Sequence, residues 1–263
     1  MIRGLTMIAV GGAVVSALCF GVAASRGPTS FSFSDIEWAD TAPSGPQTSR
    51  TLAWKGGPEL TINLPASIII QQGPKAGITL SGSEHMVNHI VLNGTTLDTD
   101  ENTPNHHYRL RDAKVRLTIT APDLTKLTLN GFGSVDWQGY DQKTLDLIIN
   151  GAASVKAHGR AENVKLTIDG AASVNLADMD ITNLDVAMDG AGSVKAGATG
   201  LAKITIDGAG SVKLTKVPMS FSKQIDGVGT VSMPKGPPDA LLQSKPAHPA
   251  DKTPEQSEED LSF

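Results

Sequence analysis

Two kinds of residue recur at a fixed interval in the second half of this chain, and both could do chemistry. A six-residue phrase occurs six times, as NGFGSV, NGAASV, DGAASV, DGAGSV, DGAGSV and DGVGTV. The amide or acidic position that opens the phrase is filled by Asn130, Asn150, Asp169, Asp189, Asp207 and Asp226. The hydroxyl position is filled by Ser134, Ser154, Ser173, Ser193, Ser211 and finally Thr230. A hydroxyl could serve as a nucleophile, and a stack of carboxylates could bind calcium.

The serine positions do not favour nucleophilic catalysis. A serine nucleophile needs a base within reach that is itself held in place. His158 is the only histidine of the repeat, and the sequence offers it no evident partner. We therefore expect the equivalent hydroxyls to form a hydrogen-bonded ladder in the turns, and we expect no catalytic residue.

The acidic positions favour a structural role over a metal site. Calcium-binding β-rolls carry the motif GGxGxD, in which the aspartate follows the glycines. Here the acidic residue precedes the glycine, and the first two phrases carry asparagine. We expect these side chains to accept hydrogen bonds from the backbone amides of the turn that follows, as in Asx turns. Such bonds contribute roughly 1.5–3 kcal/mol each, more than the repulsion of about 1 kcal/mol between neighbouring carboxylates in water. A metal ladder is the alternative.

Histidines offer a second candidate metal site. His85 and His89 stand four residues apart, and His106 and His107 follow. One helical turn would bring the first two together as ligands. The sequence supplies no cysteine nearby and no obvious third ligand, so we expect polar histidines and no bound metal or other cofactor.

Three aromatic residues cluster in the first strong repeat, namely Phe132, Trp137 and Tyr140. We expect them to wedge the junction between the repeat and the N-terminal half of the chain. The alternative is an exposed platform on which a glycan stacks.

The interval between phrases identifies the elements that must position these residues. The glycines that follow the opening Asn or Asp are separated by 20, 19, 20, 18 and 19 residues, and a constant period near twenty is typical of a solenoid. Apolar residues stand two before and four after each glycine, and also four before each of the first five, with mostly polar or small residues between them. This alternation predicts strands with one buried face. Strands repeated in one direction through short turns stack in parallel, so we predict an all-β, single-stranded, right-handed parallel β-helix.

One outward position supports this register. Five residues before the phrase glycines stand Lys126, Asp146, Lys165, Asp185 and Lys203, which alternate in sign. Stacked opposite charges are modestly favourable and like charges are unfavourable, so this column disfavours a slip by one coil.

Shorter alternating segments between residues 51 and 121 predict further strands, which form the first coils or a β cap on the solenoid. We assign residues 51–233 to one β-helix domain, residues 25–50 to a linker rich in Ser, Thr and Pro, and residues 234–263 to a disordered tail rich in Pro and acidic residues. Low apolar content leaves that tail unable to pack.

The first 24 residues have the pattern of an export signal. Arg3 is followed by an uncharged run from Leu5 to Ala24, and Val22 and Ala24 suit cleavage before Ser25. The same run is long enough to remain as a membrane anchor if it is not cleaved. Cys19 is the only cysteine, so the cleaved protein has no thiol and no disulfide. The net charge of −5 and the absence of a basic run make nucleic acid an unexpected partner.

The repeat resembles the bacterial GIN-domain family of auto-transporter adhesin heads. The resemblance runs from about Leu52 to Met233 and includes the segment Arg116–Gly131, the pattern LTINLP from Leu60 and the turn SGSE from Ser81. It implies an exported β-helix in the cell envelope and gives no catalytic residues. The Pro-rich acidic tail favours a periplasmic or envelope-anchored position over self-driven secretion.

These observations favour a non-enzymatic, adhesin-like envelope module that presents a rigid surface to a protein or a glycan. The alternatives are a polysaccharide lyase or hydrolase of the β-helix type, and a scaffold that stacks end to end. The short turns of the repeat leave little with which to build a catalytic cleft.

Overall fold

The structure is a computed structural model that describes residues 46–100 and 115–235. The export segment, most of the linker, His106, His107 and the tail after Lys235 lie outside the described residues. Among residues 46–100 and 115–235, no helix is both long enough and apolar enough to span a membrane.

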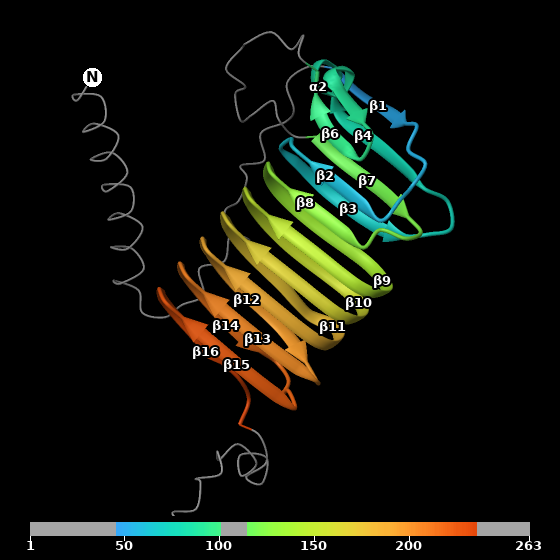
Figure 1. The fold of residues 1–263 in the computed structure, drawn as a ribbon. Helices are drawn as coiled ribbons and strands as arrows, with labels where there is room; N and C mark the ends of the chain where they lie inside the picture. The colour runs from blue at the N-terminus through green and yellow to red at the C-terminus, as the bar shows by residue number, and fades with distance from the viewer. Residues whose placement is uncertain (1–45, 101–114, 236–263) are drawn as a thin grey trace, which may run out of the picture.

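The repeat forms a parallel β-solenoid, as the alternation predicts. Three long strands each make most of one coil: β9 (Phe132–Ile149), β10 (Ala152–Ile168) and β11 (Ala171–Met188). In the following coils the strand is interrupted, giving β12 (Ala191–Ala198) with β13 (Leu201–Ile206), then β14 (Ala209–Leu214) with β15 (Ser220–Ile225), and finally β16 (Val228–Ser232). All neighbouring pairs from β9 to β16 are parallel, and Figure 1 shows them stacked along one axis.

The register places like residues over one another. Ser154 pairs with Ser173, which pairs with Ser193, and each phrase valine lies over the next in the same way. The valines Val135, Val155, Val174, Val194 and Val212 are all buried, as are Leu129, Ile149, Ile168, Met188 and Ile206. These columns form the continuous aliphatic core that the spacing predicts.

The phrase glycines allow successive coils to approach closely at one corner. The backbone is not left-handed at these glycines, so conformational freedom is not the reason for them. A Cβ at Gly170 would overlap the carbonyl oxygen of Gly151, and the same clash recurs at Gly151, Gly190, Gly208 and Gly227 with the glycine one coil earlier. Any side chain at this position would therefore push two coils apart.

The N-terminal half builds one more coil and a cap. Strands β2 (Glu59–Ile62) and β3 (Ala66–Gln72) run parallel to β8 (Lys126–Leu129) and β9. On the other side of this coil lie β6 (Thr96–Thr99) and β7 (Val115–Ala121), again in parallel. A coil that comes early in the sequence is therefore inserted between two layers that come later.

Antiparallel strands and one helix close this end. β4 (Gly77–Ser83) pairs with β7 and with β1 (Gln47–Leu52), and β5 (Ile90–Asn93) pairs with β6. The short helix α2 (Glu84–His89) contributes buried Met86 and Val87. The predicted β cap is confirmed, although β1 begins inside the segment expected to be a linker.

We expect Gly170→Ala to destabilise the fold by about 3 kcal/mol or more, since the colliding atom belongs to the backbone and cannot move aside. Urea unfolding followed by circular dichroism measures the change.

Gly77→Ala is the matched control, because a Cβ there meets no atom within 4 Å. It should be neutral or stabilise by about 0.4–1 kcal/mol. Equal stability of the two variants would contradict the role of the glycine corner.

Candidate functional site

The Asn and Asp side chains that open each phrase form an exposed column along the glycine corner. Asn150 Nδ2 donates to Asn130 Oδ1 at 2.7 Å, and Asn130 Nδ2 donates to Asn63 Oδ1 at 2.7 Å. Asn63 Nδ2 in turn donates to Asp98 Oδ2 at 2.8 Å. The amides therefore hydrogen-bond from coil to coil, toward the capped end.

The prediction that these side chains cap the turns is wrong. The amide of Ala171 donates to the carbonyl of Gly151 at 2.9 Å, and the amide of Ala191 donates to the carbonyl of Gly170 at 2.8 Å. The interstrand ladder thus uses the backbone amides that an Asx turn would need. The side chains point outward and bond to other side chains; Asp226, for example, accepts from Gln224 Nε2 at 2.6 Å.

The hydrogen-bonded column ends where asparagine gives way to aspartate. A carboxylate has no donor to offer the preceding coil. Within residues 46–100 and 115–235, no hydrogen bond reaches the side chains of Asp169, Asp189 or Asp207, and no group of three or more potential ligands is placed to hold a metal ion. These aspartates form an exposed stack of like charges.

The serine column lies on a strand face and not in the turns. Ser134 lies 3.3 Å from Ser67, and Ser173 lies 3.4 Å from Ser193, measured between hydroxyl oxygens. These distances are long for O–H···O bonds, whose usual value is about 2.7–2.8 Å. The column is a set of stacked hydroxyls with weak mutual contacts, and the prediction of a turn ladder is wrong in its placement.

The histidines do not converge on a metal site in the part of the chain that the structure describes. The short helix α2 brings the rings of His85 and His89 to 5.1 Å between centroids. His89 Nδ1 contacts Asp100 Oδ1 at 3.0 Å, and His158 Nδ1 lies 3.6 Å from Asp178 Oδ2.

The aromatic residues divide between core and surface. Trp137 and Tyr140 are each 2% exposed and meet edge to face at 5.0 Å between ring centroids, whereas Phe132 is 57% exposed. An exposed platform of all three is therefore wrong. Trp137 lies opposite Ile70 of β3, where the repeat meets the N-terminal half of the chain.

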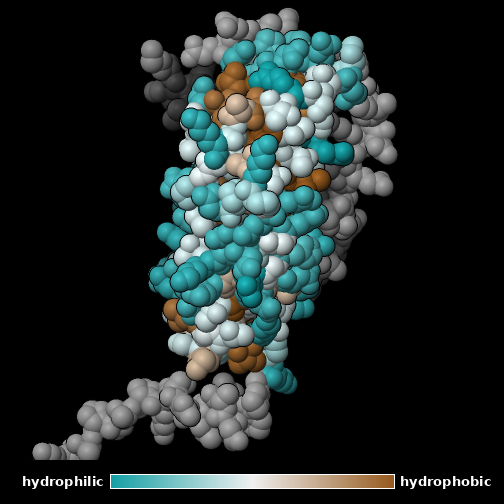
Figure 2. Space-filling view, turned by 90° about the vertical axis from the view of Figure 1, so that its right-hand side faces the viewer, coloured by the Kyte–Doolittle hydropathy of each residue, from teal (hydrophilic) through white to brown (hydrophobic). Residues whose placement is uncertain are grey.

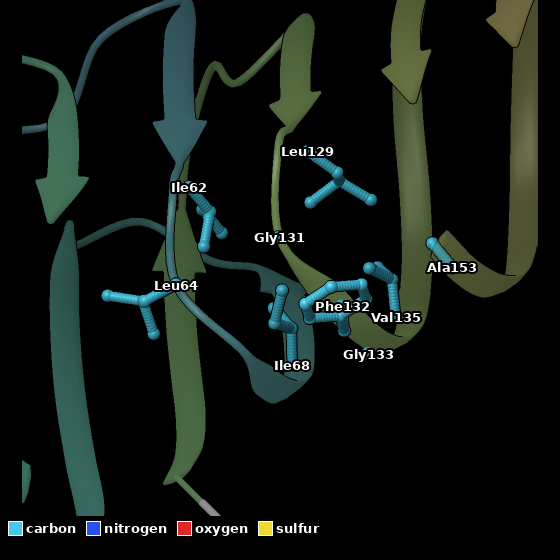
Figure 3. A pocket seen from close by; sticks show the side chains of 9 residues that line it. All are labelled: Ile62, Leu64, Ile68, Leu129, Gly131, Phe132, Gly133, Val135 and Ala153. Atoms are coloured by element: carbon cyan, nitrogen blue, oxygen red, sulfur yellow. The ribbon is translucent and has the colours of Figure 1, made fainter. Parts of the chain in front are cut away.

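A small apolar cleft lies beneath Phe132. Its lining includes Ile62, Ile68 and Val135, and Figure 3 shows these side chains around the glycines that follow Asn130. The cleft has about 10 Å³ of space, which suffices for about one water molecule. It is a packing defect at the junction and has no room for a ligand.

A larger groove lies on the strand face formed by the second half of each coil. Its volume is about 400 Å³, and it spans four coils. The polar side chains along it are Thr144, Asp146, Asn163, Lys165, Asn183, Asp185 and Lys203, and they come from β9, β10, β11 and β13. We call this surface the groove face. It runs across the strands, along the axis of the solenoid.

The alternating charge column lies in this groove. Asp146, Lys165, Asp185 and Lys203 occupy one position in successive coils, as predicted. Lys203 Nζ lies 3.9 Å from Asp185 Oδ2. The column extends one coil further than expected, because Lys126 Nζ contacts Glu59 Oε1 at 3.5 Å.

Several polar groups of the groove face have no partner among the described residues. Asn183 Nδ2 donates to Asn163 Oδ1 at 2.9 Å, which leaves the amide hydrogens of Asn163 free. The carboxylate of Asp146 accepts no hydrogen bond from the described chain, and its Oδ1 is covered. The ammonium of Lys165 is likewise outside every ion pair of the described residues. Free donors, the Asn163 amide and the Lys165 ammonium, therefore lie in neighbouring positions of one strand.

Charged residues in the middle of β9, β10 and β11, outside the groove face, already form ion pairs. Arg160 bonds Asp141 through two nitrogens, at 2.5 and 2.9 Å, and Lys216 bonds Asp180 at 2.9 Å. Hydrogen bonding to Arg160 lowers the pKa of Asp141, and hydrogen bonding to Lys216 lowers the pKa of Asp180. These groups are already satisfied, unlike those of the groove face.

The sequence predicted strands around Leu60 and Ile68 as first coils or a cap, but it did not align Glu59, Asn63 and Ser67 with the columns of the repeat. A signal was present, since LTIN from Leu60 matches LTLN from Leu127, and a serine follows each asparagine by four residues. The phrase glycine is replaced by Leu64, which hid the match.

Comparison with known proteins agrees with this architecture. The family described as "Putative auto-transporter adhesin, head GIN domain" matches residues 58–218. The chain belongs to the GIN-domain family. No curated protein sequence matches this GIN-domain protein.

A solved structure shares its fold, and others resemble it less. The first is a putative adhesin from Bacteroides fragilis, with 19% identity and a TM-score of 0.53, covering 73% of this chain and 98% of the other. A putative adhesin from Parabacteroides merdae has 13% identity and a TM-score of 0.44, with the same coverage of 73% and 98%. At this identity, the first likeness shows the fold alone.

We expect Asp169→Asn to stabilise the GIN domain by about 0.5–1.5 kcal/mol, because the new amide can donate to Asn150 Oδ1 and lengthen the column. Thermal unfolding measures the change. The reverse substitution Asn150→Asp is the control and should destabilise, and a loss of stability in Asp169→Asn would contradict this account.

Burial of Tyr140 gives a second prediction. Its hydroxyl donates to the carbonyl of Thr144, and burial raises the pKa of Tyr140 above its ordinary value. The folded state therefore keeps the proton to higher pH than the unfolded chain, and the stability that Tyr140 contributes is complete below about pH 10 and falls above it.

We expect Tyr140→Phe to be less stable than the unmodified protein by about 1 kcal/mol at neutral pH, because Thr144 loses its donor. Above pH 10 the difference should shrink, by up to about 1.4 kcal/mol per pH unit. Urea unfolding at pH 7, 10 and 11 tests this, and a difference independent of pH would contradict it.

Proposed function

We propose that this GIN domain is a non-enzymatic binding module of the bacterial cell envelope, which holds an extended polymer in the groove face. The observation that carries the proposal is the pair of groups there that have no partner among the described residues, namely the Asn163 amide and the Lys165 ammonium. Binding sites typically combine an apolar floor with a few polar groups that fix orientation. Buried Leu145, Val164 and Leu184 supply such a floor.

A glycan fits this groove better than a peptide strand does. An extended peptide binds a sheet by adding to a free edge. The groove crosses strands whose neighbours lie on both sides, so their backbone groups are already paired. Side-chain amides and charges remain, and these match the hydroxyls and the charged substituents of a polysaccharide. A protein partner would have to use side chains alone.

The envelope location rests on family membership and on the export pattern of the first 24 residues. Membership of an adhesin family favours binding over catalysis, although the absence of catalysis stays a prediction. If the domain were a lyase or a hydrolase, a polysaccharide that binds to it would become shorter during incubation with the purified protein.

The test is binding of purified envelope polysaccharide to the exported protein, measured by isothermal titration. We expect Asn163→Ala with Lys165→Ala to weaken binding at least about tenfold, the equivalent of about 1.4 kcal/mol. Lys156→Ala with Lys195→Ala is the matched control, because these exposed lysines lie on the other strand face.

Equal weakening by both pairs would assign the binding to net charge and not to the groove. No binding of polysaccharide, with capture of an envelope protein that is insensitive to Asn163 and Lys165, would overturn the proposal.

A further inference from the structure

The C-terminal end of the solenoid has no cover among the described residues. β15 pairs only with β13, and β16 pairs only with β14, so both strands present a free edge. Of the six exposed large hydrophobic residues in the described part of the chain, four lie in this region: Val217, Met219, Val228 and Met233. Figure 2 shows brown residues at this lower end and also near the capped end. The opposite end, by contrast, is closed by α2 and the antiparallel strands.

The last coil is also only partly packed. Phe221, Ile225 and Val231 occupy the inward columns, yet they remain partly exposed where the next coil would lie. Met219 is 92% exposed beside them. An apolar surface next to free strand edges is typical of a docking site for another segment.

Lys223 determines what kind of segment can dock there. It pairs with Ile204, which pairs with Val186, so it stands in a column that is aliphatic in every earlier coil. Its side chain is exposed and forms no ion pair with the described residues. A further apolar coil would bury an unpaired ammonium, which is strongly unfavourable.

A second copy of this chain is therefore a poor occupant. Two ends related by a twofold axis would bring two Lys223 ammoniums together. The other end of a second copy is closed by its cap. A segment with a carboxylate beside apolar residues matches the surface better.

Such a segment follows directly in the sequence. The structure describes the chain to Lys235, and Asp239, Leu241 and Leu242 come a few residues later. Four residues span up to about 14 Å, enough to return across coils spaced about 4.8 Å apart. Residues 236–263 carry six acidic residues and two lysines, so the segment is complementary in charge to Lys223. A tethered segment of this kind has an effective concentration in the millimolar range.

We propose that residues Asp239–Gln243 fold back over the last coil and cap the solenoid, with Leu241 and Leu242 on Phe221, Ile225 and Val231 and with Asp239 beside Lys223. The cap covers the edges of β15 and β16 and keeps the ends of two molecules apart. This inference limits the expected disorder of the tail to residues beyond Gln243, and it is independent of the groove face.

Hydrogen exchange of the full chain tests the cap. Leu241→Ser with Leu242→Ser should speed exchange in β15 and β16 roughly tenfold and leave β9 and β10 unchanged. Leu261→Ser with Phe263→Ser is the matched control, because it removes the other apolar pair of the tail. The control should change nothing.

Charge reversal tests the contact between Asp239 and Lys223. Asp239→Lys and Lys223→Asp should each speed exchange in β15 and β16, and the two together should restore the original rate.

Unchanged exchange in the Leu241 and Leu242 variant would overturn the proposal, and so would faster exchange spread evenly over the whole solenoid. Analytical sedimentation measures the oligomeric state. If the protein is a dimer, and β15 and β16 become exposed only when the dimer dissociates, the surface binds a second copy and the proposal is overturned.

Discussion

The close approach of backbones at the glycine corner is the constraint on which the rest of this structure depends. From Gly151 onward, each phrase glycine lies against the carbonyl of the glycine one coil earlier, with no space for a Cβ. This contact fixes the register, so that valine lies over valine and serine over serine. In this register, the backbone amides just after the corner donate hydrogen bonds to the preceding coil. The Asn and Asp side chains are therefore turned outward, where only the asparagines can bond to one another.

Because the coils stack in register, the two ends of the solenoid differ from each other, and so do its strand faces. The capped end is closed by elements from the N-terminal half, whereas Lys223 interrupts the apolar column at the other end. On the face, the alternating charges of Asp146, Lys165, Asp185 and Lys203 favour the correct register and leave some polar groups without partners. A column that stabilises the fold thus also supplies a surface that can bind a ligand. In the proposed function, stability and ligand binding would arise from the same repetition.

The candidate residues that were most conspicuous in the sequence have structural roles. The phrase serines and aspartates are conspicuous because they repeat, but repetition reflects the corner and not a site. Trp137 and Tyr140 are buried at the junction, and the cleft beneath Phe132 is too small for a ligand. The groove face uses residues such as Asn163 and Asn183, which lie at the opposite end of each strand segment from the phrase. They carry no motif of their own.

The sequence by itself determined the parallel stack, its period, its core columns and its charge column. These follow from local alternation and from a repeat that can bury its apolar face only against the next coil. Only the tertiary structure placed Glu59–Gln72 between β7 and β9, because that coil lacks the phrase glycine. It pairs with residues about 67 positions away in β8 and β9 and about 49 positions away in β7. Only the tertiary structure decided that the turn amides were already in use, and that Thr144, Asn163 and Asn183 line one groove. Those facts depend on neighbours one coil away, and the identity of a residue does not specify what its neighbours have left unpaired.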